Sequence, residues 1–300
     1  MNALGADFPE EPADAEVAED EGVLRYDDLI QDGRLRLECA WRPTGRALYS
    51  IPSVGKILRD FDAGVTTVLS RVALEATDAV LSPRARAKTR VRHRFEHVLS
   101  ADGSVDRLLF STWLTAIAVG KDGVEQVAGR AYGQRVLTHL GAPPGKHLVR
   151  RLAAFGERGV PEHRALWQPP TGLLELPEGA RPLDAAPRLD PARVVFGLSH
   201  TDLNQHVNFL MYLRAFEQAA VARFIDLGRS GKIAARSAQI GYRKPSFAGD
   251  TVRIALRAYE TDGAVGVVAA VVEDGAGPAE RATFAEFGSA RVVARITLRP

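Results

Sequence analysis

The sequence predicts an α+β fold made of two similar halves, each an antiparallel sheet wrapped around one helix. Apolar residues recur every three or four positions in two separate segments, 50–70 and 210–227, which is typical of amphipathic helices. Each segment is followed by several apolar or alternating runs, many of them separated by Asp-Gly turns. At roughly 150 residues per domain, the 300 residues suit two compact units.

The first half is predicted to begin with a strand, because polar and apolar residues alternate over 34–41. The helix over 50–70 follows, with Ile51, Val54, Ile57, Leu58 and Phe61 along its apolar side. Three further strands are then predicted, over 89–99, 108–119 and 124–140.

The second half repeats this order without alignable sequence identity. A short strand at 193–197 precedes the helix over 210–227. Four strands are predicted after it, over 236–243, 250–260, 264–273 and 281–298.

Composition shifts divide the chain into four parts. Residues 1–24 hold eight acidic side chains and no Lys or Arg, and they offer too little apolar surface to offset the entropy of ordering. We therefore expect a disordered acidic leader over 1–25, and the remaining residues carry a net charge of +10. Nine prolines indicate an extended connector over 141–192, leaving halves at 26–140 and 193–300.

Several protein classes do not fit the composition. A hydrophobic fraction of 46% and a mean hydropathy of −0.10 indicate a globular chain with a sizeable core. We expect no membrane span, since no uncharged apolar run reaches about 18 residues, and the N-terminus has no signal-peptide pattern. Cys39 is the single cysteine, which excludes an intramolecular disulfide and fits a cytoplasmic location.

One segment concentrates chemistry. Asp202, Asn204, His206 and Asn208 alternate immediately before the second predicted helix. Side chains two residues apart in an extended segment share a face, so these groups would converge. A carboxylate, an amide and an imidazole supply a base or nucleophile, an oriented dipole and a proton carrier. The helix start adds N–H groups suited to a developing oxyanion.

This segment, D-x-N-x-H-V-N followed by Tyr212 and a Phe-Glu-x-Ala helix, resembles the hotdog-fold thioesterases, above all plant and bacterial acyl-ACP thioesterases. The stretch 240–250 is similar to a turn of the 4-hydroxybenzoyl-CoA thioesterase-like proteins. The specific resemblance covers about residues 193–298 and concerns only element order over 34–140. It implies a tandem, or double, hotdog whose first half is degenerate and carries no site motif.

The resemblance also implies hydrolysis of an acyl-ACP or acyl-CoA thioester to a free acid and a thiol, without a cofactor. Asp202 would be the base or nucleophile, assisted by Asn204 and His206. The residues that would contact the substrate are Asn208, Phe209, Tyr212 and Ser246.

Two departures from the family pattern keep alternatives open. Phe209 stands in place of a second asparagine, and Pro245-Ser246 occupy the position of a Glu-Cys pair in the plant enzymes. If that pair is essential in the plant enzymes, this chain uses Asp202 directly, takes a different substrate, or is a non-catalytic acyl-binding or accessory hotdog protein. A hotdog hydratase or dehydratase fits less well, because its D-x-N-P-x-H pattern places histidine five residues after aspartate instead of four.

Each of these residues also has a structural interpretation. Asp202 is of a type common in turns, and Asn208 is equally suited to cap the helix or to contact substrate. Glu217 is interpreted as part of a solvated helix face, and Ser246 as a plain turn serine.

A basic run extends from Arg84 to Arg94, with Arg or Lys at every second position. It predicts either a solvated sheet edge or a docking surface for an acidic carrier protein. Nucleic-acid binding is not expected, since no aromatic-interleaved motif accompanies it, and no metal-binding motif occurs. Because a tandem chain can pair its two halves internally, both a monomer and a homodimer remain open.

Overall fold

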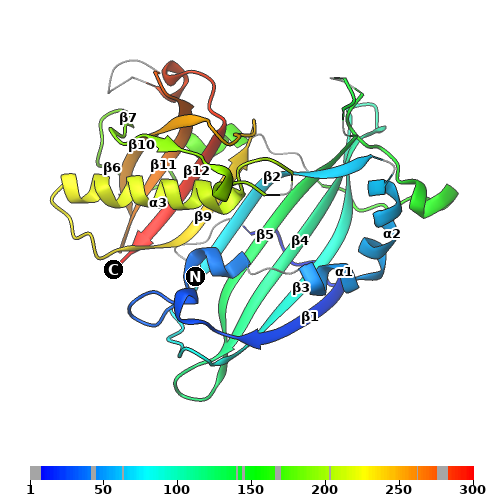
Figure 1. Cartoon of the computed structure of the whole chain (residues 1–300), viewed down its shortest axis with the longest axis horizontal. Helices are drawn as coiled ribbons and strands as arrows, with labels where there is room; N and C mark the ends of the chain where they lie inside the picture. The colour runs from blue at the N-terminus through cyan, green and yellow to red at the C-terminus, as the bar shows by residue number, and fades with distance from the viewer. Residues whose placement is uncertain are drawn as a thin grey trace. The chain divides into compact units, whose positions relative to one another are not determined.

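The computed structural model describes residues 8–41, 45–62, 64–139, 141–143, 146–165, 170–202, 204–261, 263–275 and 283–300. The chain forms two compact units, an N-terminal unit over 7–168 and a C-terminal unit that includes 169–300 (Figure 1). The division falls inside the proline-rich stretch that the sequence predicts to be a connector.

The N-terminal unit is built on a five-stranded antiparallel sheet in the order β1-β3-β4-β5-β2. The strands are β1 (Glu16–Val23), β2 (Val65–Ala76), β3 (Arg86–Leu99), β4 (Val105–Val119) and β5 (Glu125–His139). Two helices, α1 (Gly45–Ser50) and α2 (Pro52–Asp62), precede β2. Short 3-10 turns complete the unit: η1 (Tyr26–Asp28), η2 (Leu37–Trp41) and η3 (Ala153–Arg158).

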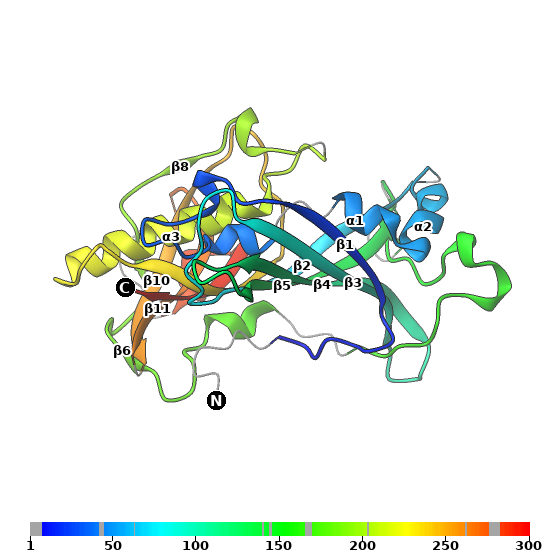
Figure 2. The ribbon, with the colours of Figure 1, turned by 90° about the horizontal axis from the view of Figure 1, so that it is seen from below.

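Helices α1 and α2 cover one face of this sheet, and the chain before β1 runs along the other side (Figure 2). Ala47, Ile51, Val54 and Ile57 of the helices are buried against apolar side chains of the strands, among them Phe95. Each fully buried side chain of this size stabilises the fold by about 1.5–3 kcal/mol, so the apolar stripe seen in the sequence fixes this packing.

Two sequence predictions fail in this unit. The helix predicted over 50–70 ends at Asp62, because Gly64 adopts φ +87° and the β-branched run that follows enters β2. A strand is predicted over 34–41, but its last residues, Leu37–Trp41, form the 3-10 turn η2. There the Trp41 ring packs over Gly133, where an added Cβ would lie 2.1 Å from the indole. This tertiary contact outweighs the alternating pattern.

The disordered leader predicted over 1–25 is also wrong, since residues 16–23 form β1; residues 1–7 of it lie outside the described residues. β1 pairs along the edge of the basic strand β3. Glu19 lies 2.8 Å from Arg90, and ion pairs also join Glu19 to Lys88, Glu11 to Arg92 and Asp14 to Arg94. The ladder hydrogen bonds and the opposite charges order a segment with little apolar surface.

Deleting residues 1–23 should therefore destabilise the N-terminal unit and promote self-association, because the edge of β3 loses its partner strand. Light scattering after size-exclusion chromatography and thermal unfolding measure both effects. Glu19→Gln is the matched control, since it keeps the strand and removes exposed ion pairs worth less than about 1 kcal/mol. A truncated protein that stays monodisperse with an unchanged Tm would contradict the prediction.

The C-terminal unit contains a second antiparallel sheet in the order β9-β12-β11-β10, with three short strands pairing with β10. The long strands are β9 (Ala234–Tyr242), β10 (Thr251–Thr261), β11 (Ala264–Glu273) and β12 (Val292–Arg299). The short ones are β6 (Arg181–Pro182), β7 (Arg188–Leu189) and β8 (Val194–Val195). The helix is α3 (Phe209–Asp226), and the 3-10 turns are η4 (Pro170–Leu174), η5 (Leu198–His200) and η6 (Phe284–Phe287).

Helix α3 crosses one face of this sheet (Figure 1). Its side chains Leu213, Phe216 and Phe224 are buried. Another apolar cluster of this unit contains Leu173 of η4 and Phe287 of η6, which pack with residues of β10, β11 and β12. β11 is consequently buried over most of its length, which explains its nearly continuous apolar sequence. The predicted helix and the first three strands are confirmed, whereas the predicted strand over 281–298 is shorter and begins at Val292.

A buried ion pair fastens α3 to the sheet. Asp184 is 4% exposed, and its carboxylate accepts hydrogen bonds from Arg223 of α3 through Nε (3.1 Å) and Nη2. Its second oxygen accepts the Ala258 N–H of β10 at 2.8 Å. The carboxylate thus has both a charge partner and a backbone donor, as a buried anion requires.

Candidate active site

The D-x-N-x-H segment forms a tight turn and not the extended run that the sequence predicts. Thr201 and Val207 pair as an antiparallel bridge, and the Asp202 N–H donates to the His206 carbonyl at 3.0 Å. Gln205 closes the turn with φ 63° and donates its N–H to the Asp202 carbonyl at 2.9 Å. The turn therefore places Asp202 and His206 opposite each other. The alternation of side chains along an extended segment, which the sequence predicts, is not the cause.

The Asp202 carboxylate is exposed and helps to shape this turn. Its Oδ1 accepts the Asn204 N–H at 2.9 Å, the geometry of an Asx turn. Asn204 is exposed as well. The structural interpretation of Asp202 is thus confirmed, and it does not exclude a chemical role because the carboxylate faces solvent, where a substrate can reach it.

His206 is half-buried against the turn that joins β9 and β10. Its backbone pairs with Phe247, and the two rings meet edge to face with centroids 5.3 Å apart. Phe247 is itself 46% exposed. The imidazole is therefore positioned by an aromatic wall that remains accessible at the surface.

Asn208 is the N-cap of α3. Its Oδ1 accepts the Leu210 N–H at 3.0 Å, and its own N–H donates to the His200 carbonyl at 2.8 Å. Of its two interpretations, the cap is confirmed. One of the N–H groups at the helix start is therefore already occupied, which leaves fewer donors for an oxyanion than the sequence predicts.

Ser246 is fully buried, and its backbone joins the motif to α3. Its N–H donates to the Tyr212 hydroxyl at 3.0 Å, and its carbonyl accepts the Val207 N–H at 2.8 Å. Burial raises the pKa of the Tyr212 phenol, and the adjacent Ser246 opposes that rise. The Ser246 Oγ has no partner with hydrogen-bond geometry in the part of the chain that the structure describes. Both residues act as structural links here, and Phe209 lies half-buried at the first turn of α3.

Replacing Tyr212 with Phe should lower the free energy of unfolding by about 1–3 kcal/mol, because the buried Ser246 N–H would lose its acceptor. Denaturant titration followed by circular dichroism measures the change. Tyr26→Phe is the control, since Tyr26 is exposed. Equal stability of the two variants would show that this hydrogen bond does not hold the turn.

Arg291 supports the site without any signal in the sequence motif, and Glu217 of the motif has a structural role. Arg291 reaches back from the start of β12 and donates to the Asp250 carboxylate (2.5 Å) and the Pro245 carbonyl (3.2 Å). Asp250 also accepts the Phe247 N–H at 3.1 Å, so the turn beneath His206 is held at both ends. Glu217 is half-buried and accepts the Ala235 N–H at 2.9 Å, which corrects its interpretation as a solvated residue.

Neither a metal site nor a membrane span emerges from the part of the chain described. No group of three or more His, Cys, Asp or Glu side chains in that part is arranged to hold a metal ion. None of its helices combines the length and apolar character needed to cross a membrane.

Part of the motif and the elements after it match a known family. Residues 204–279 match the thioesterase superfamily, a segment that runs from Asn204 through α3 and β9 to β11. No curated protein matches the sequence.

Solved structures resemble the chain over nearly its whole length. An acyl-ACP thioesterase from Bacteroides thetaiotaomicron is 17% identical with a TM-score of 0.54, covering 94% of this chain and 98% of its own. The 12:0-ACP thioesterase from Umbellularia californica is 13% identical with a TM-score of 0.56, covering 95% and 94%. A protein provisionally named oleoyl thioesterase from Lactobacillus plantarum is 13% identical with a TM-score of 0.61, covering 96% of each. At these identities the likeness establishes the hotdog-type fold alone.

Proposed function

We propose that the chain is a thioesterase that hydrolyses an acyl-ACP or acyl-CoA thioester to a free acid and a thiol. The observation that carries the proposal is the Asp202–His206 turn, in which the residues with an exposed carboxylate and a positioned imidazole are paired through their backbones, at the start of the segment that matches the thioesterase superfamily. We also propose that the two units are hotdog domains in tandem, with the reacting groups in the second. The matching order of sheet and helix in each unit supports this arrangement.

In this mechanism Asp202 removes a proton from water, and the water oxygen attacks the thioester carbonyl carbon. The tetrahedral intermediate collapses with loss of the C–S bond, and His206 delivers a proton to the departing thiolate. Asn204 orients the substrate carbonyl. Attack by the Asp202 carboxylate itself, followed by hydrolysis of the anhydride, gives the same products. Ser246 is not the nucleophile, because its hydroxyl is fully buried.

Docking of an acidic carrier protein on the basic run from Arg84 to Arg94 is a separate prediction, and ion pairs within the chain oppose it. Lys88, Arg90, Arg92 and Arg94 already face acidic residues of the chain's own N-terminal segment. An acidic carrier protein would compete with these ion pairs, so its binding would weaken as salt screens the exposed charges.

A thiol-release assay over acyl-CoA and acyl-ACP substrates of short, medium and long chain length tests the function. Steady thiol release with at least one substrate is expected. Binding of acyl-CoA without thiol release at any chain length would instead identify a non-catalytic acyl-binding protein. The same panel decides between the two carriers.

A further inference from the structure

Three buried polar atoms that lie around the Phe110 ring on one face of the N-terminal sheet have no partner with hydrogen-bond geometry among the residues described, and His97 Nδ1 further along β3 is another on that face. The three are His93 Nε2, Thr112 Oγ1 and Arg135 Nη1. His93 and Thr112 stand opposite each other in the β3–β4 register. His93 and Arg135 both contact the Phe110 ring, the imidazole with centroids 4.0 Å apart and the guanidinium carbon 5.7 Å from the ring centre. The three groups therefore form one cluster, which we call the orphan cluster.

Arg135 is the charged member of the orphan cluster. Its guanidinium carbon lies 5.2 Å from the Trp41 ring centre, so the cation sits between that indole and Phe110. No ion pair of Arg135 occurs within the described ranges. Burial lowers its pKa to about 10, which leaves the side chain charged at neutral pH. The Arg135 side chain is half-buried, with its Nη1 atom fully buried. A desolvated cation without an anion is costly, and a bound anion would offset that cost.

His93 contributes an acceptor to the orphan cluster. Its Nδ1 lies 2.9 Å from the Ser111 carbonyl oxygen, which assigns the proton to Nδ1. Burial, together with the charge of Arg135, lowers the pKa of His93 to about 3, so the ring is neutral. Nε2 is then a buried acceptor that calls for a donor such as a hydroxyl.

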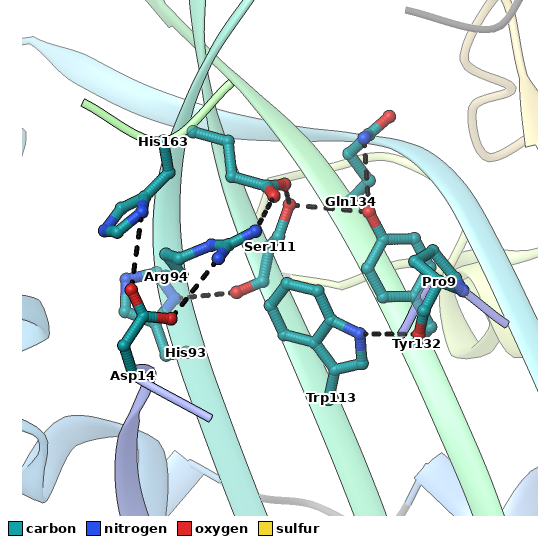
Figure 3. Close-up of polar contacts among 10 residues, drawn as sticks. Pro9, Asp14, His93, Arg94, Ser111, Trp113, Tyr132, Gln134 and His163 are labelled. Atoms are coloured by element: carbon teal, nitrogen blue, oxygen red, sulfur yellow. Dashed lines mark hydrogen bonds and ion pairs between the residues drawn. The ribbon is translucent and has the colours of Figure 1, made fainter. Parts of the chain in front are cut away.

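The opposite face of the same strands carries a separate polar network. There Glu96 pairs with Arg94 at 2.8 Å and accepts the Ser111 hydroxyl. The Tyr132 hydroxyl lies 3.2 Å from Gln134 Nε2 and 3.4 Å from the Ser111 hydroxyl (Figure 3). These contacts join the polar groups of that face to one another, although Arg94 Nε has no partner with hydrogen-bond geometry among the described residues.

We propose that the orphan cluster is a binding site for a hydroxylated carboxylic acid, distinct from the hydrolytic turn of the C-terminal unit. The ligand's carboxylate pairs with Arg135 and accepts the Thr112 hydroxyl, and the ligand's hydroxyl donates to His93 Nε2. A guanidinium binds a carboxylate through charge-assisted hydrogen bonds, which favours this anion over a neutral ester. The apolar part of the ligand packs on Trp41 and Phe110, the second of which belongs to the core beneath α1 and α2.

Isothermal titration of the full-length protein tests the site with three probes: 3-hydroxyoctanoate, octanoate and the methyl ester of 3-hydroxyoctanoate. The hydroxy acid should bind, the ester should bind at least about tenfold more weakly, and octanoate should lie between them. Arg135→Met should abolish the preference for acids over the ester, and Arg135→Lys, which keeps a charge in case the Met variant misfolds, should retain part of it. His93→Phe should abolish only the preference for the hydroxyl.

Two control variants separate this site from other effects. Arg94→Met removes a paired arginine of the opposite face and should leave all three affinities unchanged. Asp202→Asn should also leave them unchanged, so the site can be present even if the protein proves not to be a thioesterase. Equal affinity for acid and ester, or equal losses in the Arg94 and Arg135 variants, would overturn the proposal.

Discussion

Replacing Asp202 with asparagine is expected to lower thioester hydrolysis about a thousandfold, the range typical of a lost general base. Asparagine is the informative substitution because its side-chain oxygen can still accept the Asn204 N–H that shapes the turn. The exchange removes the charge and the basicity while the fold of the motif is kept. A fall in kcat with little change in KM is the expected pattern, since the carboxylate acts on the reacting water.

Thiol release by the purified variant measures this loss. Asp226→Asn is a matched control, because Asp226 is an exposed acid at the end of α3 that is far from the motif. Unchanged hydrolysis by the Asp202 variant would remove Asp202 from the mechanism. A comparable loss in both variants would point to the fold instead of the chemistry.

The largest effect on stability is expected for Asp184→Ala, which should lower the free energy of unfolding by about 3–5 kcal/mol. The substitution leaves the Arg223 guanidinium buried without its anion and the Ala258 N–H without its acceptor. Arg223 belongs to α3 and Ala258 to β10, so the helix also loses its polar attachment to the sheet.

Chemical denaturation compares this variant with Arg181→Ala. Arg181 pairs with Glu260 at 2.9 Å, but its side chain is 67% exposed, and that loss should stay below about 1 kcal/mol. Adding Arg223→Met to Asp184→Ala should restore part of the stability, because the orphaned charge is then gone. Equal effects of the Asp184 and Arg181 variants would mean that burial does not govern the strength of these pairs.

Long periodic segments and the motif could be predicted from the sequence. The stripe of Leu213, Phe216 and Phe224 specifies α3, and Asn208 has the side chain of a helix cap. The turn at 202–206 could not be predicted in the same way. It depends on Gln205 adopting φ 63°, a conformation that a glutamine side chain does not signal.

The N-terminal unit was harder to predict because its order comes from pairing between distant residues. The acids of the leader and the arginines of β3 are both visible in the sequence. The leader becomes an ordered strand only because it pairs with β3 in the register that sets Glu19 opposite Arg90. Likewise, nothing in the sequence marks Gly133 as the position on which the Trp41 ring packs, because that contact exists only in the folded chain. The orphan cluster is also a property of neighbours in space, since His93 and Arg135 belong to different strands.

The backbone of Ser246 gives the Asp202–His206 turn a property that matters for recognition. Its N–H is held by Tyr212 and its carbonyl by Val207, so the segment entering α3 is tied to a buried strand connection on both sides. A loop tied in this way is pre-organised: little conformational entropy is lost when a thioester arrives, and more of the binding energy appears as affinity. Selectivity among acyl groups should then depend on rigid shape, with slow loop closure playing no part.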